Sequence, residues 1–456
     1  MALTEYQGTP PTADNKLGLL NTIRLGVGLM GDEPLEGIEN IVDAHGRQLE
    51  INVLGKSAVL IANGTDARTV LVDEADSTSK DTRDMDVFRG VFGNFILTRP
   101  DSQDWRPFRA VAQPGFDRDH TAIYTGIVRE EAESYAAHLA EQAEGGSVVV
   151  DDLHADLTEV TARIISRALF SHNLSAEEVI QLREAMRVSL SAASEGVQTA
   201  GLSWRLRALT PSRNREIEAA KARLQGFAQD LIDRRVSAGV KGDYHDMLDM
   251  FLAAHQSDPE NFDDGWLRDE VAGFFGAGHD TTASAVLFTL SNVSGLHDEA
   301  LEEQLHIEAV DPSNVGGPQM TTAVFKETLR RNPPIWLFGR RAIEPIELRN
   351  GHIIPRNATI GISPYLIHRD PDVWEDPTRF DPMRFTNGFR PQSGSYIPFG
   401  MGARSCVGAS LAAVEGPMIL SDLYKQFPHI EVAAITTSPA AIQRPNNPLR
   451  AQFYLR

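Results

Sequence analysis

The pattern of apolar and polar positions predicts a chain built mainly of helices, with a small amount of sheet. Residues 48–53 and 57–61 lie between glycines and have the composition of two strands of a β-hairpin. A helix over 321–331 is predicted to end before Pro333 and Pro334. The other predicted elements are helices over 66–72, 120–142, 153–170 and 215–236, a strand at 147–150, and strands at 352–355 and 358–362.

The longest apolar segment, residues 266–296, predicts a helix that is buried on most of its faces. Its middle breaks this pattern, because Ala277-Gly278-His279-Asp280-Thr281-Thr282 places glycine, an acid and two threonines inside it. Such residues are poor choices for the interior of a buried helix, and a local break of this kind indicates a functional site. The plainer alternative makes Asp280 a local cap and Thr281 a side chain that bonds its own helix. We expect His279 to be structural.

Two segments without a helical period are candidates for a ligand pocket. Residues 74–104 are polar and turn-rich apart from 87–97, a mixture of apolar residues and glycine that could be a pocket wall or plain packing. Residues 194–214 are expected to join two helices over the pocket mouth as a lid. Residues 336–338 are a further candidate for the pocket lining, with ordinary core packing as the alternative. Together the three segments would accept a medium-sized, partly apolar molecule.

Composition and charge exclude some classes of function. The chain has 456 residues, of which 42% are hydrophobic, so it can bury a substantial core. Its net charge of −20 argues against a nucleic-acid partner, because phosphate binding needs a basic face. Residues 17–30 are broken by polar residues and glycines, and no basic start precedes them, so neither a membrane anchor nor an export signal is expected. With a single cysteine, these features predict a reducing, cytoplasmic location.

That cysteine, Cys406, lies in the stretch Phe399-Gly400-Met401-Gly402-Ala403-Arg404-Ser405-Cys406-Val407-Gly408. One thiol cannot form an internal disulfide or complete a zinc site. The glycines allow the backbone to approach a flat ligand closely, and N–H groups at the start of the following helical run would stabilise a thiolate. The stretch predicts a cofactor-bound thiolate, with a buried structural thiol as the alternative.

The spacing Phe-x-x-Gly-x-x-x-Cys-x-Gly resembles the heme-binding loop of the cytochrome P-450 family. The matching residues are Phe399, Gly402, Cys406 and Gly408, and Arg404 matches the basic residue usual in that loop. The resemblance implies that Cys406 is the axial ligand of the heme iron and that Arg404 contacts a propionate.

The break in the long helix resembles the oxygen-binding segment of the same family. The resemblance implies that Asp280 and Thr281 deliver protons to bound dioxygen. Ala277 and Gly278 would leave room for the dioxygen, and Gly278 would let the helical ladder open.

Further motifs occur in the order that the family has them. Trp105 and Arg109 lie four residues apart on a helix expected to begin at Asp104, and resemble the pair that reaches the heme propionates. Arg340 would bind a propionate, with Arg341 as a close alternative.

A charge network is also implied behind the heme loop. It would join Glu327 and Arg330, three residues apart, to Arg384 in a segment that resembles the family's meander. Met383 departs from the glutamate that often stands there, which puts only a peripheral contact in doubt.

Together the motifs span residues 105–408 and imply a complete, mainly α cytochrome P-450 domain over residues 1–456. It would have a small β-rich side, heme between the long central helix and the helix after the Cys406 loop, and no fused reductase. Residues 1–40 would form an extended N-terminal segment with one helix.

The implied activity is that of a heme b monooxygenase. It would use O₂ and electrons from a ferredoxin-type donor with its reductase to oxidise a small, partly apolar organic molecule, in secondary metabolism. Two alternatives stay open: oxidative coupling, cyclisation or peroxide-driven oxidation without net oxygen insertion on the same fold, and, more remotely, a non-enzymatic heme sensor.

Overall fold

The computed structural model of the chain describes residues 16–17, 34–53, 56–198, 210–239, 246–311, 319–386, 388–438 and 442–456. The chain divides into two compact units, each assembled from segments that are far apart in the sequence. The first unit contains residues 1–82, 335–378 and 390–405, and the second contains residues 83–334, 379–389 and 406–456. The expectation of one domain over residues 1–456 therefore stays a prediction.

The first unit is organised around a six-stranded sheet with the strand order β1-β2-β3-β9-β6-β4. The predicted hairpin is confirmed: β2 and β3 pair antiparallel, with Gln48 opposite Ile61. β3 pairs in parallel with β9, which pairs antiparallel with β6. The strands of this unit are β1 (Lys16–Leu17), β2 (Gln48–Val53), β3 (Lys56–Ile61), β4 (Thr78–Ser79), β6 (Phe338–Ala342), β7 (Ile346–Glu347), β8 (Ile353–Ile354) and β9 (Thr359–Ile362).

Alternation along β3 sends side chains to both faces of this sheet. Val59 and Ile61 join a core that includes Val70 and Leu71, whereas Leu60 joins a second core with residues of α2. The helical segments of this unit are α2 (Pro34–His45), α3 (Gly64–Arg68) with its π-helical continuation Thr69–Asp73, α15 (Pro364–Ile367), and 3₁₀ turns at Ala75–Ser77 and Gly402–Arg404.

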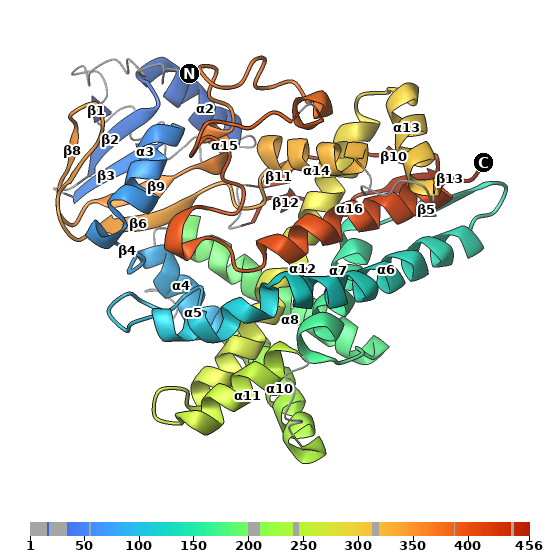
Figure 1. Cartoon of the computed structure of the whole chain (residues 1–456), viewed down its shortest axis with the longest axis horizontal. Helices are drawn as coiled ribbons and strands as arrows, with labels where there is room; N and C mark the ends of the chain where they lie inside the picture. Colours follow the sequence, from blue (N-terminus) through green and yellow to red (C-terminus); the bar gives the residue numbers. More distant parts are fainter. Residues whose placement is uncertain are drawn as a thin grey trace. The chain divides into compact units, whose positions relative to one another are not determined.

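The second unit is mainly helical (Figure 1). Its helices are α4 (Arg83–Phe92), α5 (Arg106–Ala112), α6 (Arg118–Glu141), α7 (Leu153–Phe170), α8 (Ala176–Gln198), α10 (Pro211–Ala238), α11 (Met247–Ser257), α12 (Asp264–Ser294), α13 (Glu299–Val310), α14 (Gln319–Arg331) and α16 (Ala409–Gln426), with 3₁₀ turns at Gln113–Phe116 and Pro382–Phe385. Its strands are β5 (Ser147–Val150), β10 (His429–Val432), β11 (Thr437–Ser438), β12 (Arg444–Pro445) and β13 (Ala451–Tyr454), of which β13 pairs with both β10 and β5.

The long helix α12 runs through this unit and packs against α7, α10, α14 and α16 (Figure 1). It begins after Asp263, whose carboxyl accepts a hydrogen bond from Trp266 N at 2.7 Å, and continues unbroken to Ser294. Apolar residues occur on all its sides, and the neighbouring helices bury nearly all of them. The helix predicted over 266–296 is confirmed to within two residues at each end.

Three expectations about elements are corrected. Residues 83–92 form α4, because Met85, Val87, Val91 and Phe92 share a buried face that the intervening polar residues hid in the sequence. Residues 194–198 continue α8, and residues 199–209 of the expected lid lie outside the described residues. The N-cap of α5 is Trp105, and the Asp104 carboxyl instead accepts from Arg106 N at 3.2 Å.

Candidate active site

A narrow exposed stripe interrupts the buried surface of α12. Between Glu270 and Leu290, every residue of the helix is buried except Ala277, Gly278 and Thr281. Ala277 and Thr281 are four residues apart and therefore lie on one face. We refer to the accessible space beside this stripe as the hollow. Because Ala277 carries only a methyl group, the stripe leaves room for a ligand beside Thr281.

The backbone under this stripe is an intact helix. Thr281 Oγ1 donates a hydrogen bond to Ala277 O at 3.0 Å, so the expected opening of the ladder is not observed. A Cβ at Gly278 would lie 2.7 Å from Ile165 Cδ1 of α7. The structure therefore assigns Gly278 to the close packing of α12 on α7.

Asp280 lies beside the stripe, but its side chain is buried. Its Oδ1 is 3.4 Å from His154 Nε2 of α7, and its buried Oδ2 has no hydrogen-bond partner. The neighbouring His279 is buried too, with its ring stacked on Phe275 and its Nδ1 3.2 Å from Phe275 O. Asp280 is thus an incompletely bonded acid beside the hollow, and His279 has the contacts of a structural residue.

Cys406 lies just before α16, whose N-cap is Gly408. Its surface is accessible, although protein surrounds it on most sides. Burial raises the pKa of the Cys406 thiol, while a hydrogen bond from Gly408 N–H and the positive charge of Arg109 act in the opposite direction. The thiol is therefore accessible and lies close to two groups that favour its thiolate form.

Trp105 and Arg109 are both half-buried at the start of α5. Arg109 Nε donates to Gln113 Oε1 at 2.9 Å. Burial lowers the pKa of Arg109, and Cys406 opposes that effect. A guanidinium in this position could bind a carboxylate of a ligand that also contacts Cys406.

Four of the expected cofactor residues, Phe399, Gly402, Arg404 and Arg340, lie in the first unit. Gly402 has φ +75° and lies against Leu71 O, where any Cβ would overlap the carbonyl, so only glycine fits there. Arg340 is buried and donates to Gly339 O at 2.8 Å, whereas Arg341 is half-buried. The binding roles of these residues stay predictions.

Glu327, Arg330 and Arg384 are brought together in the second unit. Arg330 Nε and Nη2 lie 2.8 Å from the two oxygens of Glu327, and Arg384 Nε lies 3.5 Å from Glu327 Oε1. Asp381 N also donates to Glu327 at 2.9 Å, and Arg330 donates to Arg379 O at 3.0 Å. Buried charges are tolerable when they are hydrogen-bonded in this way.

Two acids that the sequence analysis did not select are also buried in this unit. Glu415 of α16 bonds Thr282 of α12, and burial raises its pKa to about 8. Glu270 accepts from Trp266 Nε1 at 2.9 Å and Ile96 N at 3.2 Å, and burial raises its pKa to about 8 as well. For Glu415, a lone acid among apolar residues is the sequence signal, whereas Glu270 directly follows Arg268 and Asp269 and has no such signal.

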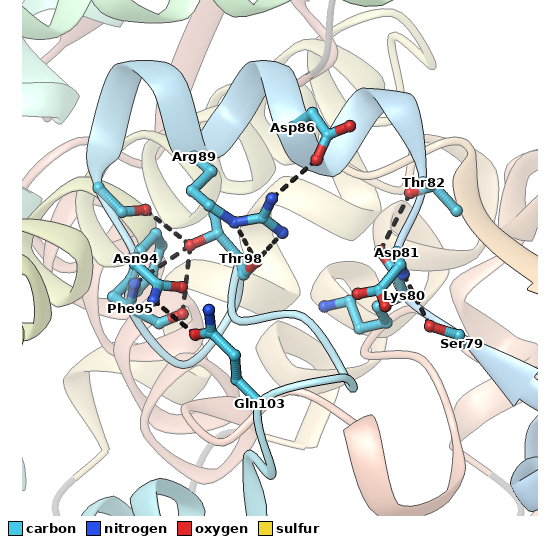
Figure 2. A network of polar contacts seen from close by, with 11 residues as sticks. Ser79, Lys80, Asp81, Thr82, Asp86, Arg89, Asn94, Phe95, Thr98 and Gln103 are labelled. Atoms are coloured by element: carbon cyan, nitrogen blue, oxygen red, sulfur yellow. Dashed lines mark hydrogen bonds and ion pairs between the residues drawn. The ribbon is translucent and has the colours of Figure 1, made fainter. Parts of the chain in front are cut away.

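The segment after α4, residues 93–99, is tied both to α12 and to α4. Asp269 of α12 accepts from Asn94 N at 2.7 Å, in addition to the bond between Glu270 and Ile96 N. Figure 2 shows Arg89 of α4 between Asp86 and Thr98, with its Nη2 2.7 Å from Thr98 O. Residues 87–97 were expected to be either a pocket wall or plain packing. Val87 and Phe92 are packed, against α8 and α12 respectively, whereas Leu97 is exposed.

Comparison with known proteins identifies the family. The sequence model of the family described as Cytochrome P450 matches residues 10–439. This chain belongs to the cytochrome P450 family. It is 30% identical over 405 residues to cyclooctatin synthase of Streptomyces melanosporofaciens, which covers 86% of this chain and 85% of that protein. It is 28% identical over 404 residues to cyclooctat-9-en-7-ol 5-monooxygenase of the same organism, with 86% and 84% covered.

The fold is likewise that of a cytochrome P450. The chain is similar to the crystal structure of CYP175A1 from Thermus thermophilus, with a TM-score of 0.75, 22% identity, and 96% of this chain and 99% of that chain covered. It is also similar to a 6-coordinated cytochrome P450 from another strain of Thermus thermophilus, with a TM-score of 0.71, 22% identity, and coverage of 92% and 98%. The predicted mainly helical P450 fold with small sheets is confirmed.

As a cytochrome P450, the protein is a monooxygenase and an oxidoreductase with a heme-thiolate cofactor. The second unit fits that group. Cys406 is the sole cysteine, so no other residue of the chain can supply the thiolate. Its accessible sulfur and the nearby cation of Arg109 are chemically suited to a heme iron and a heme carboxylate, and the roles of these two residues stay predictions.

The described residues contain no group of three or more His, Cys, Asp or Glu side chains placed to hold a metal ion. No described helix is both long enough and apolar enough to span a bilayer.

Proposed function

We propose that this cytochrome P450 binds heme b through Cys406 and inserts one oxygen atom into a small, largely apolar organic molecule. A ferredoxin-type protein with its reductase would supply the electrons in the cytoplasm. When bound, the heme supplies activation of O₂, and the Cys406 thiolate favours O–O cleavage by donating electron density.

The observation that carries this proposal is the pairing of an exposed hydroxyl with a buried acid on α12. Thr281 lies on the exposed stripe, and the adjacent Asp280 has one carboxyl oxygen without a partner. Oxygen insertion consumes protons at a site from which bulk water must be kept away. Asp280 would hold the proton, and the Thr281 hydroxyl would pass it into the hollow.

The remaining site residues would bind and orient the cofactor. Arg109 and Trp105 are proposed to contact a propionate from α5, and Arg340 and Arg404 to do so from the first unit. Phe399, Gly402 and Gly408 would shape the loop around the sulfur. The network of Glu327, Arg330 and Arg384 would support that loop.

The substrate class rests on the curated relatives. Both Streptomyces melanosporofaciens proteins carry names from the cyclooctatin series, and one is named for monooxygenation of cyclooctat-9-en-7-ol. We infer that a compact apolar ring compound with few polar groups, made in secondary metabolism, is the substrate of this chain. Leu97, exposed beside α4, and the small side chain of Ala277 are consistent with such a ligand.

The test combines a spectrum with a product mass. The dithionite-reduced protein with CO should show the absorption band of thiolate-ligated heme, and Cys406→Ala should abolish it. Incubation with cyclooctat-9-en-7-ol, NADPH and a surrogate ferredoxin pair should give a product heavier by one oxygen.

Other results would contradict the proposal at different points. A histidine-type Soret band would reject Cys406 as the iron ligand. A product lighter by two hydrogens would indicate oxidative coupling or cyclisation instead of oxygen insertion. If cyclooctat-9-en-7-ol causes no type I spectral shift, the inferred substrate class is wrong. The assignment of Cys406 as the heme ligand does not depend on that result, because the CO-bound spectrum tests it separately.

A further inference from the structure

The carboxyl of Asp280 faces a histidine, and this contact carries an inference that rests on the proposed function. His154 stands in the first turn of α7, and its Nε2 is 3.4 Å from both Asp280 Oδ1 and Ser284 Oγ of α12. The His154 side chain keeps 17% of its surface exposed, whereas Asp280 keeps 4%. The imidazole therefore lies between solvent and an acid that solvent does not reach directly.

We propose that His154 is a positioning residue that orients Asp280 and admits protons to it from solvent. In each transfer the imidazole takes up one proton from water and gives one to Asp280 Oδ1, so its own charge is unchanged afterwards. Asp280 passes its proton toward the hollow beside Thr281 and is then ready to accept the next one.

The groups facing this pair support a neutral, proton-accepting ring. Burial lowers the pKa of His154, and the positive charge of Arg444 of β12 lowers it further. The negative charges of Asp280 and of Asp152, at the start of α7, act in the opposite direction. The buried His279 of α12 is a further titratable neighbour of Asp280. A ring that is neutral near pH 7 can take up a proton, which a lysine or arginine partner could not do without first losing one.

The geometry at Asp280 also leaves a place for the proton to go. Oδ1 lies 3.4 Å from His154 Nε2, while Oδ2 is buried and has no hydrogen-bond partner. Ser284, one turn after Asp280, is fully buried and meets the same imidazole nitrogen. His154 thus meets two side chains of α12, so its ring orientation is set before any ligand binds.

The first experiment measures coupling without any turnover. The His154 ring is titrated by NMR in the reduced, CO-bound holoprotein, which is diamagnetic, and its signal is assigned with the His154→Gln protein. Replacing Asp280 by Asn should lower the pKa of His154, because the acid favours the charged imidazole. An unchanged His154 titration in Asp280→Asn would overturn the proposal, and this test does not depend on the stability of a His154 variant during turnover.

The second experiment follows the fate of oxygen with NADPH, a surrogate ferredoxin and its reductase, and no added substrate. Reduction to water consumes more protons per oxygen molecule than release as hydrogen peroxide. His154→Gln keeps an N–H donor for Asp280 but cannot titrate, so it should raise the peroxide-to-water ratio about tenfold and remove its dependence on pH below the ordinary imidazole pKa of 6.5.

A matched control is available on the same part of the chain. His172 also pairs with a carboxyl, Glu178 at 3.2 Å, and also keeps 17% of its side chain exposed. His172→Gln should therefore behave as the wild type. Equal peroxide ratios in His154→Gln and the wild type would overturn the proposal, whereas a wild-type protein without the thiolate-heme band would instead contradict the proposed function.

Discussion

Glu327 and Arg330 form a fully buried ion pair, three residues apart on α14, with Arg330 Nε 2.8 Å from Glu327 Oε2. Neither side chain exposes any surface to solvent. Removal of one partner would leave a buried charge uncompensated, and such a charge is far more costly than the pair itself.

Glu327→Ala should therefore lower the free energy of unfolding by about 3–5 kcal/mol. The measurement is chemical denaturation of the holoprotein followed by circular dichroism. The control is Glu184→Ala, which breaks another pair at the same helical spacing, Arg187 Nη2 to Glu184 Oε1 at 2.7 Å, whose side chains are 60% and 49% exposed. That change should cost about 1 kcal/mol or less, and equal losses in the two variants would contradict the argument from burial.

The buried Glu415 should make the free energy of unfolding depend on pH. Burial raises its pKa to about 8, from an ordinary value of 4.5. In the unfolded chain this carboxyl loses its proton near the ordinary value, while in the folded chain it keeps the proton up to about pH 8. The stabilisation is therefore complete below the unfolded pKa and decreases as the pH rises toward the folded one.

Glu415→Gln keeps a polar group opposite Thr282 but cannot ionise. Between about pH 5 and 8, the wild type should lose stability relative to this variant by at most about 1.4 kcal/mol per pH unit. Denaturant midpoints measured across this range check the slope. Parallel curves for the two proteins would show that Glu415 is already ionised in the folded chain.

The close contact between Gly273 of α12 and Phe95 allows a test of how tightly the segment after α4 is packed. A Cβ at Gly273 would overlap the ring of Phe95, so Gly273→Ala should displace that ring and lower the free energy of unfolding by about 1–3 kcal/mol. Hydrogen exchange at residues 93–99 should become faster, because their backbone bonds to Asp269 and Glu270 depend on the position of this segment.

The matched control for this change is Gly126→Ala. Gly126 also lies inside a helix, α6, but a Cβ there would meet nothing within 4 Å. Alanine should stabilise that helix by about 0.5–1 kcal/mol. If both substitutions stabilise the protein, Phe95 can move away without cost, and the close packing is not required.

The Thr281 hydroxyl is expected to determine how much of the NADPH consumed leads to oxygen insertion. Thr281→Ala removes the hydroxyl on the exposed stripe and should raise the hydrogen peroxide released per NADPH about tenfold. The control is Thr289→Ala in the same helix. Thr289 Oγ1 likewise donates to the carbonyl four residues before it, Ala285 O at 2.8 Å, but Thr289 is fully buried. Unchanged coupling in Thr281→Ala would mean that another group, or the substrate itself, delivers the protons.

The sequence by itself determined the elements whose pattern is local. The hairpin, the strand at Ser147–Val150 and helix Leu153–Phe170 were predicted at or within one residue of their observed bounds, because alternation and helical period follow directly from backbone geometry. It also left a single candidate for the cofactor thiolate, since the chain has one cysteine, and the role of Cys406 stays a prediction. Asp280 and Thr281 stood out because they violate the apolar pattern of a buried helix.

Only the tertiary structure decided which distant groups meet these residues. Nothing local to His154 indicates that it faces Asp280, and nothing local to Glu415 indicates that Thr282 is its partner. Gly278 was expected to open α12, but its role depends on Ile165 of another helix. Burial of a given charge, and therefore its pKa and its use, is set by the packing of segments that are far apart in the sequence, and helical periodicity contains no record of that packing.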